Sequence, residues 1–429
     1  MPDGPGPVRH VSLKPMTHDA PSASAPALPS PVPRPSRPAG GPLPPSAGRL
    51  LGIDLARGLA VFGMYAAHVG PEPTVGGPVG LLAELARGRS SALFALLAGF
   101  SLVLITGRPR PHTGRAGRQA MGRIVLRALI LIVAGYALTA LDTDVDVILA
   151  FYGLIFLIVL PLYRLRARTL ALLAAASALL MPVALYAIQR AIYGGNWADA
   201  FIAADPLARA SGTDGLLELL FTGEYPALTW TPFMIAGMAV ARLDLTQART
   251  RARLALTGGG LAVLGYGGSW LALHLVPGAL TTIAAATDGG AAASAWWSDG
   301  VGYLSDDTPA AWLLVGAPHS QTTFSVLGNT GVALLVVAGC VTAAARLPRL
   351  TRLLRPVAAV GMIALTAYVA HILAIHVVGM EEEPGPALVA LLAFVGAAML
   401  LATVWTRYFR RGPLEYLLYR ATRITRHIR

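Results

Sequence analysis

Ten apolar stretches limit what this chain can fold into, because each is about the length needed to cross ~30 Å of hydrocarbon. The chain is 55% hydrophobic and only 13% charged, whereas a soluble domain usually carries about 25% charged residues. A soluble fold could not keep this much apolar surface away from water. The sequence therefore predicts an all-α, polytopic integral membrane bundle of about ten transmembrane helices. The stretches lie near residues 51–69, 90–106, 121–140, 146–163, 168–189, 226–241, 254–276, 321–345, 356–378 and 386–406.

The charged residues are divided between the two sides of this predicted bundle. If the N-terminus is cytoplasmic, 30 of the 34 basic residues face the cytoplasm and 17 of the 22 acidic residues face outward. This division is the positive-inside pattern of a multi-pass membrane protein. It predicts that both termini are cytoplasmic and that the protein lies in the plasma membrane. It also accounts for the net charge of +12 without a nucleic-acid partner.

Composition divides the chain into three parts. Residues 1–47 are rich in Pro, Ala, Ser and Gly and lack apolar periodicity, which predicts a disordered cytoplasmic tail. Residues 48–409 hold the transmembrane domain, and residues 410–429 form a basic cytoplasmic segment. Two outer segments, 190–225 and 277–320, exceed the length of simple connectors, and long ordered loops are often functional. The apolar stretch Gly215–Phe221 in the first of them is expected to lie along the interface or to dip into the bundle.

The first apolar stretch carries three ionisable side chains: Asp54, Arg57 and His68. Asp54 and Arg57 are three residues apart, so they share a helix face and can pair. Arg57 and His68 are eleven apart, which places them about 20° out of register and ~16 Å apart along the axis. Ionisable groups on a membrane helix are costly and suggest a function. The alternatives are a topology anchor for Arg57 and an interfacial histidine for His68.

These residues belong to a longer pattern that resembles a known family. Arg57 and His68, with ten residues between them, resemble the motif of the membrane acyltransferase-3 superfamily. The surrounding GIDLARGLAVFGM, from Gly52 to Met64, is closer to bacterial YeiB-like membrane proteins and to the catalytic domain of heparan-alpha-glucosaminide N-acetyltransferase. The resemblance continues through most of residues 49–420. Its further segments are Arg89–Gly99, Asp146–Gly153, Tyr225–Trp230 with Gly237 and Arg242, Gly361–Tyr368 and Arg411–Glu415.

The resemblance implies transfer of an acyl group, in the first instance acetyl, from cytoplasmic acyl-CoA to an acceptor outside. The acceptor is then a glycan of the cell envelope or another small molecule. The family's arginine and histidine correspond to Arg57 and His68. Histidine suits the role of general base because its unperturbed pKa lies near 6.5. We expect Arg57 and Asp54 to organise the donor side.

Further candidates follow from residue chemistry. Guanidinium groups suit the phosphates of the donor, although positive-inside anchoring explains the same cluster. Tyrosine hydroxyls can donate to a carbonyl oxygen, but aromatic side chains are also common in interfacial belts. His371 is expected to contact the acceptor or to be a buried, hydrogen-bonded histidine. The donor-side cluster is Arg108, Arg110, Arg115, Arg118 and Arg123, and the acceptor-side candidates are Tyr152, Tyr225, Trp230 and His371.

No metal site is expected. His371 and His376 are five residues apart and therefore about 140° apart around a helix, which puts them on different faces. Two other functions stay open: a small-solute transporter, which would show broken helices at matching positions of two repeats, and a non-catalytic protein of the same fold. Membrane lipids are expected partners, and the sequence leaves open whether the protein forms a homo-oligomer.

Overall fold

The structure is a computed structural model that describes Met1, Gly4 and residues 45–195, 197–287, 292–298, 308–379 and 386–428. The chain divides into two compact units, Met1–Pro42 and Leu43–Arg429. The predicted disorder of residues 1–47 lies almost entirely outside the described residues. Helix α1 begins at Pro45, so the last three residues of that predicted tail are helical.

The described residues form helices and short helical turns and contain no strand. The predicted all-α fold is therefore confirmed for the described part of the chain. The α-helices are α1 Pro45–Val69, α2 Gly77–Ala86, α3 Arg89–Thr106, α4 Gly114–Thr139, α5 Leu149–Val159, α6 Ala167–Tyr193, α7 Trp197–Ala204, α8 Pro206–Ser211, α9 Ala227–Ala241, α10 Ala248–Ala262, α11 Gly268–Leu275, α12 Ala279–Ala286, α13 Thr323–Arg346, α14 Pro348–Leu353, α15 Arg355–Met362, α16 Ala364–Val378, α17 Ala387–Tyr408 and α18 Pro413–Thr422. The shorter turns are η1 Pro73–Val75, η2 Leu160–Arg164, η3 Glu218–Thr222, η4 Val263–Gly267, η5 Ala292–Ser294, η6 Ala310–Leu314 and η7 Arg423–His427.

Every predicted span overlaps one or more helices, but the count of ten is not confirmed. Among the described residues, 5 helices are long and apolar enough to cross a membrane, and up to 7 do so if each of two bent helix pairs is one span. Two more apolar helices, Leu149–Arg164 and Ala227–Ala241, are shorter. Helix α1 is not among these candidates, because Asp54, Arg57 and His68 lower its mean hydropathy.

The ninth predicted span is wrong in one respect. The stretch 356–378 was expected to be one helix, whereas the chain bends by 87° between α15 and α16. Ile363, the residue at the bend, has left the helical region, with φ of −118° and ψ of 34°. The bend turns the start of α16 toward α18, and this contact forms part of the site described below.

Helices α1 and α3 lie at the centre of the packing. Helix α1 packs against α3, α13 and α15, and α3 packs against α9. The contact between α3 and α9 requires glycine, because a Cβ on Gly99 would lie 1.9 Å from the carbonyl oxygen of Met234. A Cβ on Gly237 would lie 1.7 Å from the carbonyl oxygen of Leu96. Small residues allow such close approach of membrane helices.

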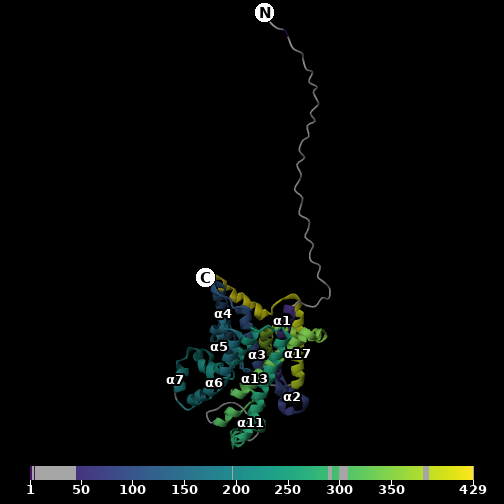
Figure 1. The fold of residues 1–429 in the computed structure, drawn as a ribbon. Helices are drawn as coiled ribbons and strands as arrows, with labels where there is room; N and C mark the ends of the chain where they lie inside the picture. Colours follow the sequence, from purple (N-terminus) through teal and green to yellow (C-terminus); the bar gives the residue numbers. More distant parts are fainter. Residues whose placement is uncertain are drawn as a thin grey trace. The chain divides into compact units, whose positions relative to one another are not determined.

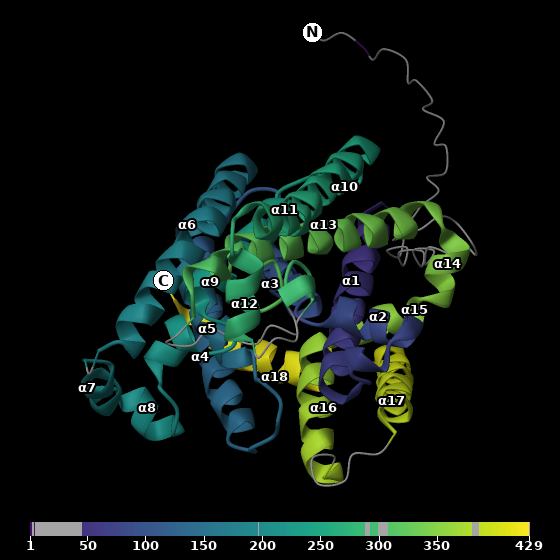
Figure 2. The ribbon, with the colours of Figure 1, turned by 90° about the horizontal axis from the view of Figure 1, so that it is seen from below.

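Different elements lie at the two ends of the bundle. Figure 1 shows the C-terminus near α4 at one end and α2 and α11 toward the other end. The C-terminal segment is held to α4 by hydrogen bonds from Gln119 to the carbonyl oxygens of Arg426 and Ile428, at 3.0 and 3.2 Å. Figure 2 shows α16 and α17 on one side of the bundle and α6 and α10 on the opposite side.

The apolar stretch Gly215–Phe221 packs into the protein. Leu217 and Leu219 are 4% and 2% exposed, and the carbonyl oxygen of Phe221 accepts a 2.7 Å hydrogen bond from Gln189 of α6. The stretch is thus packed against the protein on one side, which agrees with a position along the interface as well as with insertion into the bundle, so both predictions stay open.

Candidate functional site

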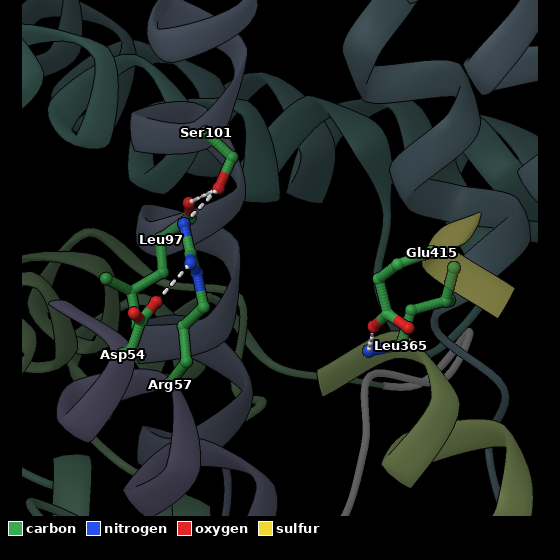
Figure 3. Close-up of polar contacts among 6 residues, drawn as sticks. All are labelled: Asp54, Arg57, Leu97, Ser101, Leu365 and Glu415. Carbon is green, nitrogen blue, oxygen red and sulfur yellow. Dashed lines mark hydrogen bonds and ion pairs between the residues drawn. The ribbon is translucent and has the colours of Figure 1, made fainter. Parts of the chain in front are cut away.

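Arg57 lies in α1 with its guanidinium held on two sides (Figure 3). Nη1 donates to Oδ1 of Asp54 at 2.9 Å, and Nη2 donates to Oγ of Ser101 in α3 at 2.7 Å. Ser101 in turn donates to the carbonyl oxygen of Leu97 at 2.7 Å. The predicted pairing of Asp54 with Arg57 is confirmed. The two contacts fix the plane of the guanidinium group, which a lysine side chain could not reproduce.

Arg57 opens onto a cavity of about 190 Å³ between α1, α3, α4, α5 and the bent pair α15–α16. A second guanidinium, that of Arg127 in α4, also lines this cavity and interacts electrostatically with Arg57 and with Glu415. Within the described residues, Arg127 has no hydrogen bond or ion pair. Two guanidinium groups and one carboxylate, that of Glu415, therefore line the same cavity.

Glu415 closes another side of the cavity and caps the bend in the chain. Its Oε1 accepts hydrogen bonds from the backbone N–H groups of Leu365 and Thr366 at 2.8 and 3.2 Å, and its Oε2 accepts from the Thr366 hydroxyl at 2.6 Å. Figure 3 shows Glu415 reaching Leu365 from α18. A carboxylate at the N-terminus of α16 satisfies the free N–H groups and the helix dipole there. The C-terminal helix is thus part of the site.

His68, near the end of α1, forms a pair with His371 of α16. Nδ1 of His68 lies 2.8 Å from Nε2 of His371, and the rings are stacked with centroids 5.1 Å apart. His371 is 2% exposed and also packs on Tyr65, with ring centroids 4.6 Å apart. The two histidines, predicted separately, belong to one site.

The hydrogen bonds of this pair determine which nitrogen carries each proton. Nδ1 of His371 contacts the carbonyl oxygen of Tyr368, which can only accept, so Nδ1 of His371 is the donor. Nε2 of neutral His371 then accepts from Nδ1–H of His68. Neutral His68 is left with its lone pair on Nε2, the form that a general base requires.

An aromatic layer separates the cavity from the histidine pair. Phe94 and Tyr152 line the cavity and stack with ring centroids 5.8 Å apart. Phe94 also stacks on Tyr368 at 6.4 Å, and Tyr368 contacts His371 at 5.1 Å. Tyr152 donates its hydroxyl proton to the carbonyl oxygen of Ser91 at 3.0 Å. The predicted residue Tyr152 therefore belongs to the layer of rings that connects the cavity beside Arg57 with His371.

Tyr225 and Trp230 lie in a second aromatic cluster, with His319 as a member. The ring centroids of Tyr225 and Trp230 are 4.8 Å apart, and those of His319 lie 5.6 and 5.7 Å from them. Both predicted residues are buried, at 5% and 3% exposure. His319 forms an ion pair with Glu224 and interacts electrostatically with His68. The structure thus links the predicted acceptor residues to His68 through His319.

His319 and Glu224 were missed in the sequence. Neither belongs to a spacing pattern, and both lie in the two long segments, 190–225 and 277–320, that the sequence predicts to be outside. His319 has a φ of 61° and Gln321 a φ of 58°, a left-handed conformation that is uncommon for residues other than glycine. Gln321 donates to the carbonyl oxygen of Glu224 at 3.0 Å and accepts from the Thr229 hydroxyl at 2.6 Å. Strained residues held in this way often mark functional sites.

The five arginines predicted to bind the donor do not converge on Arg57. None of them is among the described residues that line the cavity. Arg108 donates to the carbonyl oxygen of Leu243, and Arg123 donates to that of Gln119 at 3.3 Å. Arg115 donates to the carbonyl oxygen of Ile428 at 3.4 Å. Arg110 and Arg118 lie on the same segment. A donor-binding role for this cluster stays a prediction.

These features define a class of protein: a helical membrane protein in which one helix carries a paired arginine and, further along, a histidine that contacts a buried histidine of another helix. Residues 49–270, more than half of the chain, match the family described as "Heparan-alpha-glucosaminide N-acetyltransferase, catalytic". The chain belongs to this family. Residues 277–425 match a second family, described as "Protein of unknown function (DUF418)". No curated protein matches the chain at a significant level.

The two matches confirm the resemblance drawn from the sequence motifs. The acetyltransferase match contains Arg57 and His68, whereas the DUF418 match, which is the YeiB-like part of the resemblance, contains His371 and Glu415. The contact between His68 and His371 therefore joins the two matched regions. The cavity joins them as well, because Arg57 of the first region and Glu415 of the second both line it.

Proposed function

We propose that the protein is a membrane acyltransferase of the plasma membrane that moves an acyl group, in the first instance acetyl, from cytoplasmic acyl-CoA to an extracytoplasmic acceptor. The observation that carries the proposal is the chain of hydrogen bonds from His68 through His371 to the Tyr368 carbonyl oxygen. This chain leaves Nε2 of His68 unprotonated and free to take a proton. Membership of the acetyltransferase family supports the reaction class.

On the donor side, Arg57 and Arg127 provide cations for the anionic groups of acyl-CoA. Arg57 is oriented by Asp54 and Ser101, and Arg127 lines the same cavity. A volume of about 190 Å³ is below the ~300–1,000 Å³ of sites that enclose a whole drug-sized ligand. The cavity therefore suits one part of the donor, and the remainder extends beyond it.

On the acceptor side, His68 acts as the general base. The hydroxyl oxygen or amine nitrogen of the acceptor forms a bond to the thioester carbon while its proton passes to Nε2 of His68. The carbon–sulfur bond breaks, and the sulfur leaves with the electron pair as the thiolate of CoA. His371 keeps Nδ1 of His68 engaged, so that the lone pair stays on Nε2. The acceptor we propose is a hydroxyl or amine of a cell-envelope glycan.

The test is CoA release from acetyl-CoA by the full chain, purified in mild detergent, with and without cell-envelope glycans. Removing a general base typically lowers the rate by ~10²–10⁴, so His68→Ala should lose most turnover while it still binds CoA. Acceptor-dependent release above about a tenth of the wild-type rate in His68→Ala would assign the base to another group. No release by the wild type with any glycan or small amine would overturn the proposal.

A small-solute transporter is the second candidate, and the bend between α15 and α16 is the observation that favours it. Transporters bind substrates at the ends of discontinuous helices. Here, however, Glu415 already occupies the N-terminus of α16, which disfavours an anionic substrate at that position. Uptake of labelled amino sugars into proteoliposomes without CoA release would favour the transporter over the acyltransferase.

A further inference from the structure

A second, larger cavity lies on the side of the bundle formed by α6 and α10. Its volume is about 490 Å³, within the ~300–1,000 Å³ range of small-molecule sites. Helix α6 packs on α9, and α10 packs on α13, so that α9 and α13 form the floor between the two outer helices. The lining is mostly small and apolar, with Ala174, Ala178, Ala236, Leu261 and Leu334 as examples. We call this cavity the α6–α10 groove.

The surface around the groove is apolar. Leu172 and Leu180 of α6 are 71% and 67% exposed, and Leu256 of α10 is 76% exposed. In a membrane protein such side chains face hydrocarbon rather than water. A ligand of this groove therefore enters from the lipid phase, and its buried part is a hydrocarbon chain.

One end of the groove is cationic. Arg168, the second residue of α6, and Arg253 of α10 both line it, with Thr250 beside them. Within the part of the chain that the structure describes, neither guanidinium has a hydrogen bond or ion pair. The nearby Arg251 differs, because it is buried and donates to the carbonyl oxygens of Leu245 and Thr246 at 3.0 and 2.7 Å. Arg168 and Arg253 carry the same charge at this end of the groove, which we call its mouth, and an anion between them would relieve their repulsion.

We propose that the α6–α10 groove binds an anionic phospholipid. One acyl chain lies along the alanine face of α6, and the phosphate lies between Arg168 and Arg253. A planar guanidinium is well suited to phosphate, and basic pockets between membrane helices are known to hold anionic lipid head groups. The division of basic residues places this mouth on the cytoplasmic side, where anionic lipids are found. The site is separate from the acyl-transfer site and does not depend on that function.

The experiment is a titration of the full-length protein, purified in detergent and stripped of lipid, followed by native mass spectrometry. The probes are phosphatidylglycerol, phosphatidylcholine with matched acyl chains, and inorganic phosphate. We expect one phosphatidylglycerol to bind more tightly than phosphatidylcholine. Equal affinity for the two lipids would overturn the proposal. Inorganic phosphate that binds as tightly as phosphatidylglycerol would reassign the arginines to a soluble anion and would also overturn it.

Variants test the position of the site. Arg168→Gln with Arg253→Gln should weaken phosphatidylglycerol binding by about 30-fold, which is roughly 1 kcal/mol for each arginine. The matched control is Arg166→Gln with Arg249→Gln, which removes the same charge from the same two segments outside the groove lining. Equal losses in the two double variants would show only a general effect of charge and would overturn the site.

A third variant leaves both arginines in place. Ala175→Trp fills the groove from α6 and should exclude the acyl chain, so that phosphatidylglycerol binding falls to the level of phosphatidylcholine. This variant keeps the proposal testable if the arginine double variant does not fold. Unchanged phosphatidylglycerol affinity in a folded Ala175→Trp protein would overturn the proposal.

Discussion

His68 and His371 are 303 residues apart in the chain, yet Nδ1 of one lies 2.8 Å from Nε2 of the other. The pair joins α1 to α16 and is continued by the Tyr368 carbonyl oxygen. His371 therefore has a defined task if His68 is the base: it fixes the proton of His68 on Nδ1. A residue that acts in this way positions the base without touching the substrate.

The first prediction concerns His371. His371→Ala should lower acyl transfer by about tenfold to a hundredfold, less than the ~10²–10⁴ expected for loss of the base itself. His371→Gln should recover most of this loss, because an amide oxygen can accept from Nδ1–H of His68. The measurement is CoA release across pH 5 to 9. Equal activity of the alanine and glutamine variants would show that His371 only fills space.

The second prediction concerns Arg57. Arg57→Lys and Arg57→Ala should weaken CoA binding by about tenfold to a hundredfold, since a charged hydrogen bond contributes roughly 1.5–3 kcal/mol. An ammonium group cannot keep both Asp54 and Ser101 in the plane that Arg57 uses. Ser101→Ala removes only one of the two contacts and should have a smaller effect. Calorimetry with CoA measures all three, and unchanged affinity would reduce Arg57 to a topology anchor.

The third prediction concerns the aromatic layer. Phe94 stacks on both Tyr152 and Tyr368, between the cavity and the histidine pair. Phe94→Ala should open this layer to water and raise hydrolysis of acetyl-CoA in the absence of an acceptor. Phe156→Ala is the control, because it removes an equal ring that lines the same cavity from α5. Hydrolysis that rises equally in both variants, or in neither, would contradict a barrier at Phe94.

The contacts of this site that could be predicted from the sequence are those between residues close together in the chain. The pairing of Asp54 with Arg57 follows from helical periodicity, because the two residues are three apart. The contact of His68 with His371 does not, because it requires α1 and α16 to be neighbours, and periodicity within one helix says nothing about its partners. The sequence therefore named both histidines but gave them separate roles.

Arg127 and Glu415 illustrate a different difficulty. Arg127 is the last of six basic residues between positions 107 and 127, and positive-inside anchoring explains all six equally well. Glu415 lies in a basic C-terminal segment, where nothing in the sequence distinguishes it from a solvent-exposed acidic residue next to arginines. Only the bend at Ile363, which turns the start of α16 toward α18, gives Glu415 its contacts. Length and hydropathy carry no information about such a bend.

The fourth prediction tests the packing of the helix that carries Arg57. A Cβ on Gly361 of α15 would lie 1.8 Å from the carbonyl oxygen of Asp54. Gly361→Ala should therefore destabilise the protein by about 1–3 kcal/mol, the usual cost of overpacking. Gly339→Ala is the control, since a Cβ there meets nothing within 4 Å and alanine favours a helix. Thermal unfolding in detergent should separate the two variants. A Gly361→Ala protein as stable as the control would contradict this close approach.

The last prediction tests the orientation in the membrane. The division of basic residues predicts that the segment 190–225 lies outside and that the start of α10 lies in the cytoplasm. In a Cys340→Ala background, which removes the chain's one cysteine, Ala210→Cys should react with an impermeant maleimide added to intact cells. Ala248→Cys, which is also exposed, should react only after the membrane is made permeable. Both positions carry alanine in exposed parts of the chain, so that a difference in labelling reports the side of the membrane rather than burial.

The reverse pattern would place His68 toward the cytoplasm and Arg57 toward the outside. Acyl-CoA would then have to enter from the histidine end, and the assignment of donor and acceptor sides would be wrong.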